Sequence, residues 1–221
     1  MTFETPPLGD HYNYSGFDPE WLKNPEIQEK ARKLAEFWQK EFASLDFKAS
    51  DDEEILIHFV NDQNLVDIQA DDSAVLKNRS RFYDGGRENL EKHGFDFEKA
   101  DAEFGTEKCV VTIPLRSFKR WLDTLSWLKL TGAGVLDNAI VFKVPKKDIL
   151  LRDGMFVENM FKIDAEGQDK DKLDLDRLAY FNSTSHYNEE LFDDEQAIPE
   201  AWVPHKLSLE GAQTINYQEQ E

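Results

Sequence analysis

The chain has 221 residues and a formal net charge of −19, from 45 Asp and Glu against 26 Lys and Arg. This acidity disfavours nucleic acid and anionic membranes as partners for the surface as a whole, and it favours a basic protein. Apolar residues make up 40% of the chain, which indicates a folded domain, and the single Cys excludes an intramolecular disulfide. Because it has no long apolar stretch and no basic N-terminal region, we expect a cytoplasmic protein without a membrane span.

Residues 1–17 are expected to form an extended aromatic arm ahead of one α+β domain that spans residues 18–221. Two consecutive prolines prevent regular structure in the arm, while Tyr12 and Tyr14 supply aromatic side chains that can anchor it. We therefore predict that the arm lies across the domain or docks into a neighbouring subunit, which would make an oligomer.

An amphipathic helix is predicted over residues 25–45. Asn24 is a favoured N-cap residue, and Pro25 suits the first helical position. Apolar residues recur three or four positions apart and form one stripe, which suits a helix that covers a sheet. The stripe consists of Ile27, Ala31, Leu34, Trp38, Phe42 and Leu45.

Two apolar segments at residues 55–60 and 65–69 are predicted to pair as a β-hairpin, because a short polar turn separates them. The following region is mixed in composition and interrupted by glycines. Short helices are predicted there around residues 73–82, 86–93 and 96–103.

The stretch from Lys108 to Arg152 holds the centre of the predicted fold. Strands at residues 109–114 and 139–144 flank a helix at residues 117–130, which is the arrangement of a crossover between two parallel strands. Its nine Lys and Arg against three Asp give this stretch a net charge of +6.

Two interpretations of this positive charge are open. The basic side chains could form a patch that binds an anionic ligand or an RNA backbone. They could instead neutralise the acidic C-terminal third within the fold, and the overall charge favours this interpretation. The residues proposed for the patch are Arg116, Lys119, Arg120, Lys146 and Lys147.

Residues 153–221 hold 17 acidic side chains against 5 basic ones, and we expect this third to be largely irregular. Residues 162–176 are predicted to be a polar loop, since their carboxylates lack the spacing of a calcium-binding EF-hand. Shorter elements are predicted as strands at residues 178–181, 203–209 and 213–217, an acidic turn or helix at residues 189–195, and an extended strap at residues 198–204 anchored by Trp202.

These elements predict an α+β fold, because strands and helices do not alternate regularly enough for an α/β fold. The N-terminal amphipathic helix and the central helix would cover a mixed β-sheet. The strands of that sheet would be residues 55–60, 65–69, 109–114, 139–144 and 203–209.

The sequence offers no cluster of catalytic or metal-binding residues. The five His are too far apart to form a local pair of metal ligands. Cys109 begins an apolar strand, which suits a buried, inert thiol. We predict no catalytic residue, no metal and no cofactor.

One short segment resembles an enzyme family. Ser183-Thr184-Ser185 and the terminal Glu219 and Glu221 resemble the Ser-Thr-Ser strand and the Glu-x-Glu pair of ADP-ribosyltransferases. The resemblance implies that Ser183 and Ser185 would shape a nicotinamide pocket and that Glu221 would orient a ribose hydroxyl.

The leading hypothesis is a non-enzymatic interaction protein that binds a macromolecular partner, as an inhibitor, an immunity-type factor or an assembly component. The alternatives are an enzyme with a dispersed, ADP-ribosyltransferase-like site and a binder of an anionic ligand. Nucleic acid is expected only through residues 108–152. The residues expected to contact a protein partner are Tyr12, Tyr14, Trp21, Asp193, Asp194 and Glu195.

Overall fold

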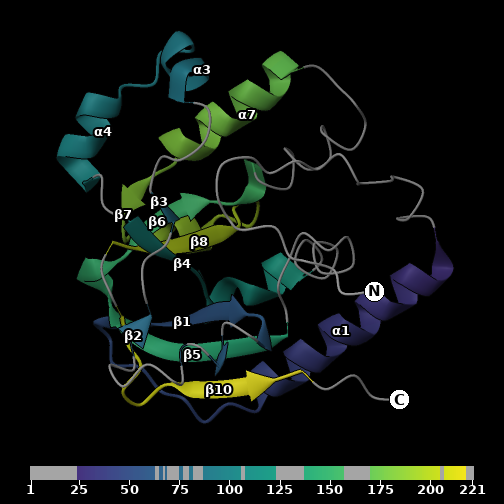
Figure 1. Ribbon diagram of the computed structural model, residues 1–221. Helices are drawn as coiled ribbons and strands as arrows, with labels where there is room; N and C mark the ends of the chain where they lie inside the picture. Colours follow the sequence, from purple (N-terminus) through teal and green to yellow (C-terminus); the bar gives the residue numbers. More distant parts are fainter. Residues whose placement is uncertain are drawn as a thin grey trace.

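The computed structural model describes residues 24–62, 65, 66, 68, 75, 76, 80, 81, 87–105, 108–122, 137–156, 170–204 and 207–217. The fold is α+β, as predicted, and Figure 1 shows its helices and its antiparallel sheet. The helices are α1 (Pro25–Ala43), α3 (Arg87–Lys92), α4 (Phe97–Phe104), α7 (Lys170–Asn182) and α8 (Glu190–Asp193). The strands are β1 (Glu53–Val60), β2 (Val75–Leu76), β3 (Ser80–Arg81), β4 (Lys108–Pro114), β5 (Asn138–Pro145), β6 (Leu150–Asp153), β7 (Ser185–His186), β8 (Pro199–Val203), β9 (Leu207–Ser208) and β10 (Gln213–Asn216).

The main sheet has the strand order β10-β5-β1-β4-β8-β6-β7, with β3 paired to β4, and β2 pairs separately with β9. Every pairing between described strands is antiparallel, so the prediction of a mixed sheet is wrong. β4 and β5 do run in the same direction, as the predicted crossover requires. They are not neighbours, however, because β1 lies between them and runs antiparallel to both.

The predicted hairpin of residues 55–60 and 65–69 is wrong. β1 pairs with β4 and β5, while Leu65, Val66 and Ile68 are helical. Leu65 and Ile68 pack against the core and Val66 is 57% exposed, so the apolar positions follow a helical spacing of three. An apolar run this short does not distinguish a strand from a helix.

Three other predictions need correction. Residues 75–76 and 80–81 form short strands where a helix was expected, and the strand predicted at residues 178–181 belongs to α7. The strap predicted at residues 198–204 forms the strand β8, which pairs within the main sheet. Of the strand expected at residues 203–209, only Leu207 and Ser208 form a separate strand, β9. The described part of this third is therefore largely regular and not irregular, since it holds α7, α8 and β7 to β10.

The prediction of the N-terminal helix is confirmed. The Asn24 side chain accepts a hydrogen bond from the Glu26 N–H at 2.9 Å, and Pro25 occupies the first turn. Leu34, Trp38 and Phe42 are buried at intervals of four residues, which places them on one face of α1. That face packs against the sheet.

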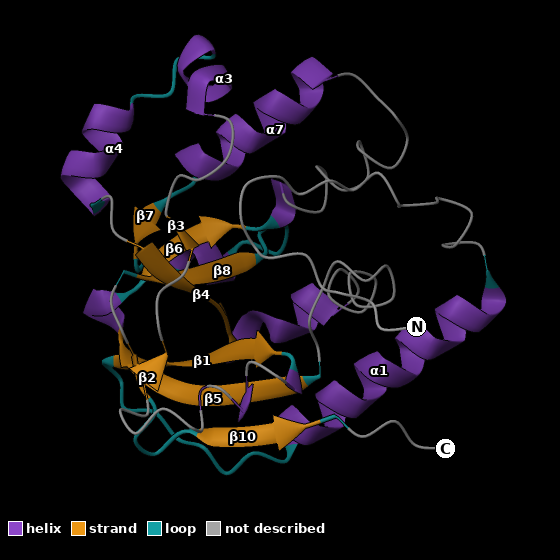
Figure 2. Ribbon diagram, in the orientation of Figure 1, coloured by secondary structure: helices purple, strands orange, loops and turns teal. Residues whose placement is uncertain are grey.

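Two apolar clusters lie side by side on the same face of the sheet. Near α1, Ile57 and Val141 pack with Phe118 and Trp121 of the helical segment that follows β4; residues 123–136 of the predicted central helix lie outside the described residues. Towards the other end of the sheet, α3, α4 and α7 pack over Cys109 and other residues of β4, β6 and β8. Figure 2 shows these two groups of helices at opposite ends of the sheet.

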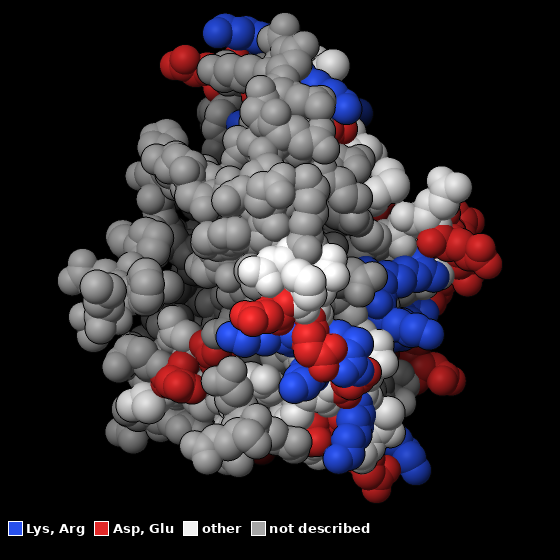
Figure 3. Space-filling model, turned by 90° about the vertical axis from the view of Figure 1, so that its right-hand side faces the viewer, with Lys and Arg blue, Asp and Glu red and all other residues white. Residues whose placement is uncertain are grey.

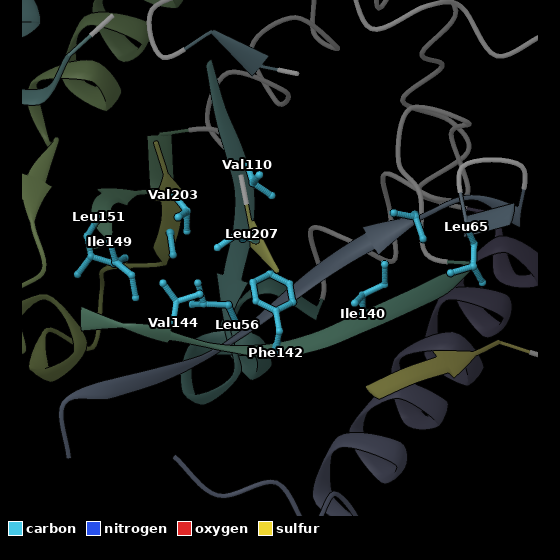
Figure 4. Packing of buried hydrophobic residues seen from close by; sticks show 12 residues of the cluster. Leu56, Leu65, Val110, Ile140, Phe142, Val144, Ile149, Leu151, Val203 and Leu207 are labelled. Atoms are coloured by element: carbon cyan, nitrogen blue, oxygen red, sulfur yellow. The ribbon is translucent and has the colours of Figure 1, made fainter. Parts of the chain in front are cut away.

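The opposite face of the sheet holds a separate apolar cluster. Figure 4 shows Leu56, Ile140 and Phe142 of β1 and β5 with Val110 and Val203 of β4 and β8. Because alternate residues of a strand point to opposite faces, Val110 belongs to this cluster while its neighbours in β4 face the helices.

No helix in the described part of the chain combines the length and the apolar composition that a membrane crossing requires.

Candidate partner-binding site

The acidic turn, residues 189–197, contains three of the residues expected to contact a protein partner. It includes α8 and ends just before β8. Asp193, Asp194 and Glu195 are exposed. The Asp194 carboxylate accepts a hydrogen bond from the Gln196 N–H at 2.9 Å, whereas Asp193 and Glu195 form no ion pair with any residue that the structure describes. Their charge is therefore presented to the solvent.

Arg120 holds the backbone of this turn. Its guanidinium donates to the carbonyl oxygens of Phe192, Asp194 and Ala197 at 2.9, 2.7 and 2.9 Å. Arg120 lies in the helical segment directly after β4, which is itself fixed by the burial of Trp121. The guanidinium binds the backbone of the turn and leaves the carboxylates facing outwards.

The chain directly after the acidic turn is fixed by further hydrogen bonds. The Trp121 indole and the Ser117 hydroxyl both donate to the Pro199 carbonyl oxygen, at 2.9 and 3.0 Å. The Ile198 N–H donates to the Asp153 carboxylate at 2.9 Å. Gly154 donates its N–H to the Ile198 carbonyl oxygen at 2.8 Å and allows the close approach, since a Cβ there would lie 2.2 Å from the Trp121 ring. The acidic turn is thus anchored at its C-terminal end.

A second set of contacts joins the start of the acidic turn to the sheet. Arg116 forms ion pairs with Glu54 at 2.9 Å and with Glu189 at 2.5 Å, and its guanidinium lies 3.4 Å from the centre of the Phe192 ring. Lys146 pairs with the same Glu189 at 2.8 Å. The hydrogen bonds from Arg116 and Lys146 lower the pKa of Glu189 to about 2.

Three of the five residues proposed for an anion-binding patch therefore contact the C-terminal third. Arg116 and Lys146 pair with Glu189, and Arg120 binds backbone carbonyls of the acidic turn. Lys119 and Lys147 are exposed. On the face seen in Figure 3, Lys and Arg side chains lie among Asp and Glu side chains.

A buried charged cluster that sequence reasoning missed joins α7 to the sheet. Arg152 of β6 is 0% exposed, and its guanidinium carbon lies 5.0, 4.8 and 4.3 Å from the ring centres of Tyr180, Phe181 and Trp202. Glu200 of β8 accepts hydrogen bonds from the Tyr180 hydroxyl and from the Trp202 indole. The sequence signal was an Arg that directly follows three apolar residues, Ile149 to Leu151.

Burial dominates the electrostatics of this cluster. It raises the pKa of Glu200 and raises the pKa of Tyr180 well above its ordinary value, although Arg152 nearby acts in the opposite direction on both groups. The cluster holds α7 against the sheet, since its members come from α7, β6 and β8.

The Ser-Thr-Ser segment has structural contacts at the end of α7. The Ser183 hydroxyl donates to the Tyr180 carbonyl oxygen and accepts from the Asp153 N–H, at 2.7 and 3.0 Å. The Thr184 hydroxyl donates to the Phe181 carbonyl oxygen at 2.7 Å and accepts from the Arg152 guanidinium at 2.9 Å. These bonds terminate the helix and join it to β6.

Several sequence-predicted positions lie outside the described residues. They include the arm at residues 1–17 with Tyr12 and Tyr14, and also Trp21, Glu219 and Glu221. Cys109 is buried, as predicted. Within the described ranges, no three His, Cys, Asp or Glu side chains form a group that could hold a metal ion.

Comparison of the chain with protein-family models, with curated proteins and with solved structures finds no match.

Proposed function

We propose that the chain is a non-enzymatic interaction protein that binds a basic macromolecular partner, as an inhibitor, an immunity-type factor or an assembly component. The observation that carries the proposal is the acidic turn, whose backbone is held by hydrogen bonds. Arg120 holds its backbone through three carbonyl oxygens, while the side chains of Asp193, Asp194 and Glu195 are exposed.

A turn whose backbone is held in this way is suited to binding, because it has less conformational entropy to lose when the partner arrives. The exposed carboxylates add to a net charge of −19 and attract a basic surface during the approach. Complementary charge of this kind increases the association rate and makes binding sensitive to salt.

The test is affinity capture with the full-length chain from an extract of its own cells, followed by a titration with the purified candidate. A variant with Asp193→Asn, Asp194→Asn and Glu195→Gln keeps the shape of the turn and removes its charge. We expect this variant to bind the captured partner about tenfold or more weakly, and we expect binding to weaken as salt rises.

A matched control neutralises three exposed carboxylates elsewhere, through Glu88→Gln, Glu98→Gln and Glu103→Gln. It carries the same change in net charge and is expected to bind like the unaltered protein. Equal loss of binding in both variants would contradict a role for the acidic turn. Failure to capture any basic partner at low salt would contradict the proposed function itself.

A further inference from the structure

β10 is the last strand at one end of the sheet and the lowest strand in Figure 1. It pairs with β5 on one side. Among the described strands, none pairs with its other side. The outer edge of such a strand offers backbone N–H and C=O groups to an added strand.

The register identifies which groups of β10 point outwards. The Tyr217 N–H donates to the Asp137 carbonyl oxygen at 2.7 Å, so this pair is hydrogen-bonded. In an antiparallel ladder such pairs alternate with pairs that make no hydrogen bond, and Ile215 therefore also bonds to β5. Thr214 and Asn216 lie in the alternate pairs, so their N–H and C=O groups point away from β5.

The side chains of β10 leave this edge open to pairing. The strand contains no Pro and no charged residue, which are the features that commonly protect a sheet edge. Thr214 and Asn216 are exposed on one face of the strand. On the other face, the half-buried Ile215 lies in the same apolar cluster as Tyr217, whose ring centre is 4.9 Å from that of Phe37. An added strand would extend this apolar face.

The negative charge near β10 indicates which kind of segment would pair with its outer edge. Glu210 is exposed shortly before β10, and the exposed Asp62 accepts a hydrogen bond from Asn138, the β5 partner of Asn216. A second copy of the chain would also carry a net charge of −19 and would be repelled, whereas a basic segment would be attracted.

We propose that the outer edge of β10 is a strand-addition site for an extended, basic segment of a partner protein. The inference rests on the proposed function, and it adds a backbone-pairing surface to the acidic turn. The added segment would exchange hydrogen bonds with Thr214 and Asn216 and would alternate apolar and basic side chains.

The test is an NMR titration of the isotope-labelled full-length chain with a short peptide that alternates Lys and Val. We expect shift changes centred on β10 and amide exchange at Thr214 and Asn216 that slows about tenfold or more at saturation. Binding should weaken as salt rises. A peptide that alternates Glu and Val is expected not to bind.

Two variants at position 214 distinguish a loss of edge pairing from a loss of folding. Thr214→Pro removes an outward N–H without removing a bond to β5, and proline is tolerated at such edge positions. We expect it to bind the Lys-Val peptide about tenfold or more weakly. Thr214→Val keeps the N–H and should bind like the unaltered protein. Circular dichroism and thermal unfolding confirm that each variant is folded.

Four outcomes would overturn the inference. A folded Thr214→Pro variant that binds the peptide normally would exclude the edge, and so would an absence of peptide binding at low salt. Self-association that Thr214→Pro abolishes would assign the edge to a second copy. Shift changes confined to residues 193–195 would also exclude the edge, but they would leave the proposed function standing.

Discussion

Replacing Arg120 with alanine is expected to loosen the acidic turn. The change removes three hydrogen bonds from a charged donor to the carbonyl oxygens of Phe192, Asp194 and Ala197. Each such bond contributes about 1 kcal/mol to stability when the donor is partly exposed, so the expected loss is about 2–4 kcal/mol. For a chain of this length, that loss lowers the melting temperature by about 4–16 °C.

The loss can be measured by urea unfolding, and its location by hydrogen exchange. We expect the Arg120→Ala change to accelerate amide exchange in residues 192–198 more than in β1 and β5, because the turn opens before the sheet does. Lys119→Ala is the control, since Lys119 is adjacent and exposed, and its loss should change stability by less than about 0.5 kcal/mol. If Arg120→Ala is as stable as this control and its turn exchanges no faster, the turn is not held by Arg120.

Three further predictions concern the buried cluster, the ion pairs and the close approach at Gly154. Arg152→Met removes a fully buried guanidinium that lies among three aromatic rings and favours the charged form of Glu200. We expect it to cost about 3–5 kcal/mol in urea unfolding, whereas Arg152→Lys should recover part of this; a loss below about 1 kcal/mol would contradict the role of the cluster. The pKa of Glu189 is lowered to about 2, so its stabilising contribution is complete above its ordinary pKa of 4.5 and is lost as the pH falls towards 2. Glu189→Gln should therefore be less stable than the unaltered protein at neutral pH, by about 1 kcal/mol because the side chain is half exposed. The free energies of unfolding of the two proteins should converge near pH 2. A difference that stays constant with pH would contradict the stabilising role of the Glu189 ion pairs. Gly154→Ala would place its Cβ 2.2 Å from the Trp121 ring and should cost about 1–3 kcal/mol in a thermal unfolding assay, while an unchanged melting temperature would show that Trp121 can move aside.

The elements that sequence reasoning placed well are those in which local signals agree. α1 has a capping residue, a proline in its first turn and a buried stripe, and all three indicate the same helix. β4 and β5 are apolar and β-branched and are bounded by prolines. The helices α3 and α4 were also predicted close to their observed positions.

The errors arise where structure depends on distant partners. Leu65 and Ile68 fit either a strand or a helix, and only packing against the apolar cluster decides between them. The direction of β4 relative to its neighbours depends on β1, which enters the sheet from far earlier in the chain. Tyr180 and Phe181 were predicted to lie in a strand, but both belong to α7 and are buried.

The candidate site was predicted in part. The acidic residues of the turn were visible in the sequence, whereas the hydrogen bonds from Arg120 to the backbone of the turn were not, because backbone acceptors have no sequence signal. The excess of basic residues between Lys108 and Arg152 did favour contacts with the C-terminal third. Arg116, Arg120 and Lys146 make such contacts.

The position of β8 also affects how the chain can fold. β8 lies between β4 and β6 and, among the described strands, it alone pairs with both of them. In a growing chain that ends before Pro199, β1, β4, β5 and β6 have been synthesised. β8, which pairs with both β4 and β6, has not. The sheet therefore cannot form as one unit until residues 199–203 have been synthesised, and the edges of β4 and β6 that β8 covers stay open until then.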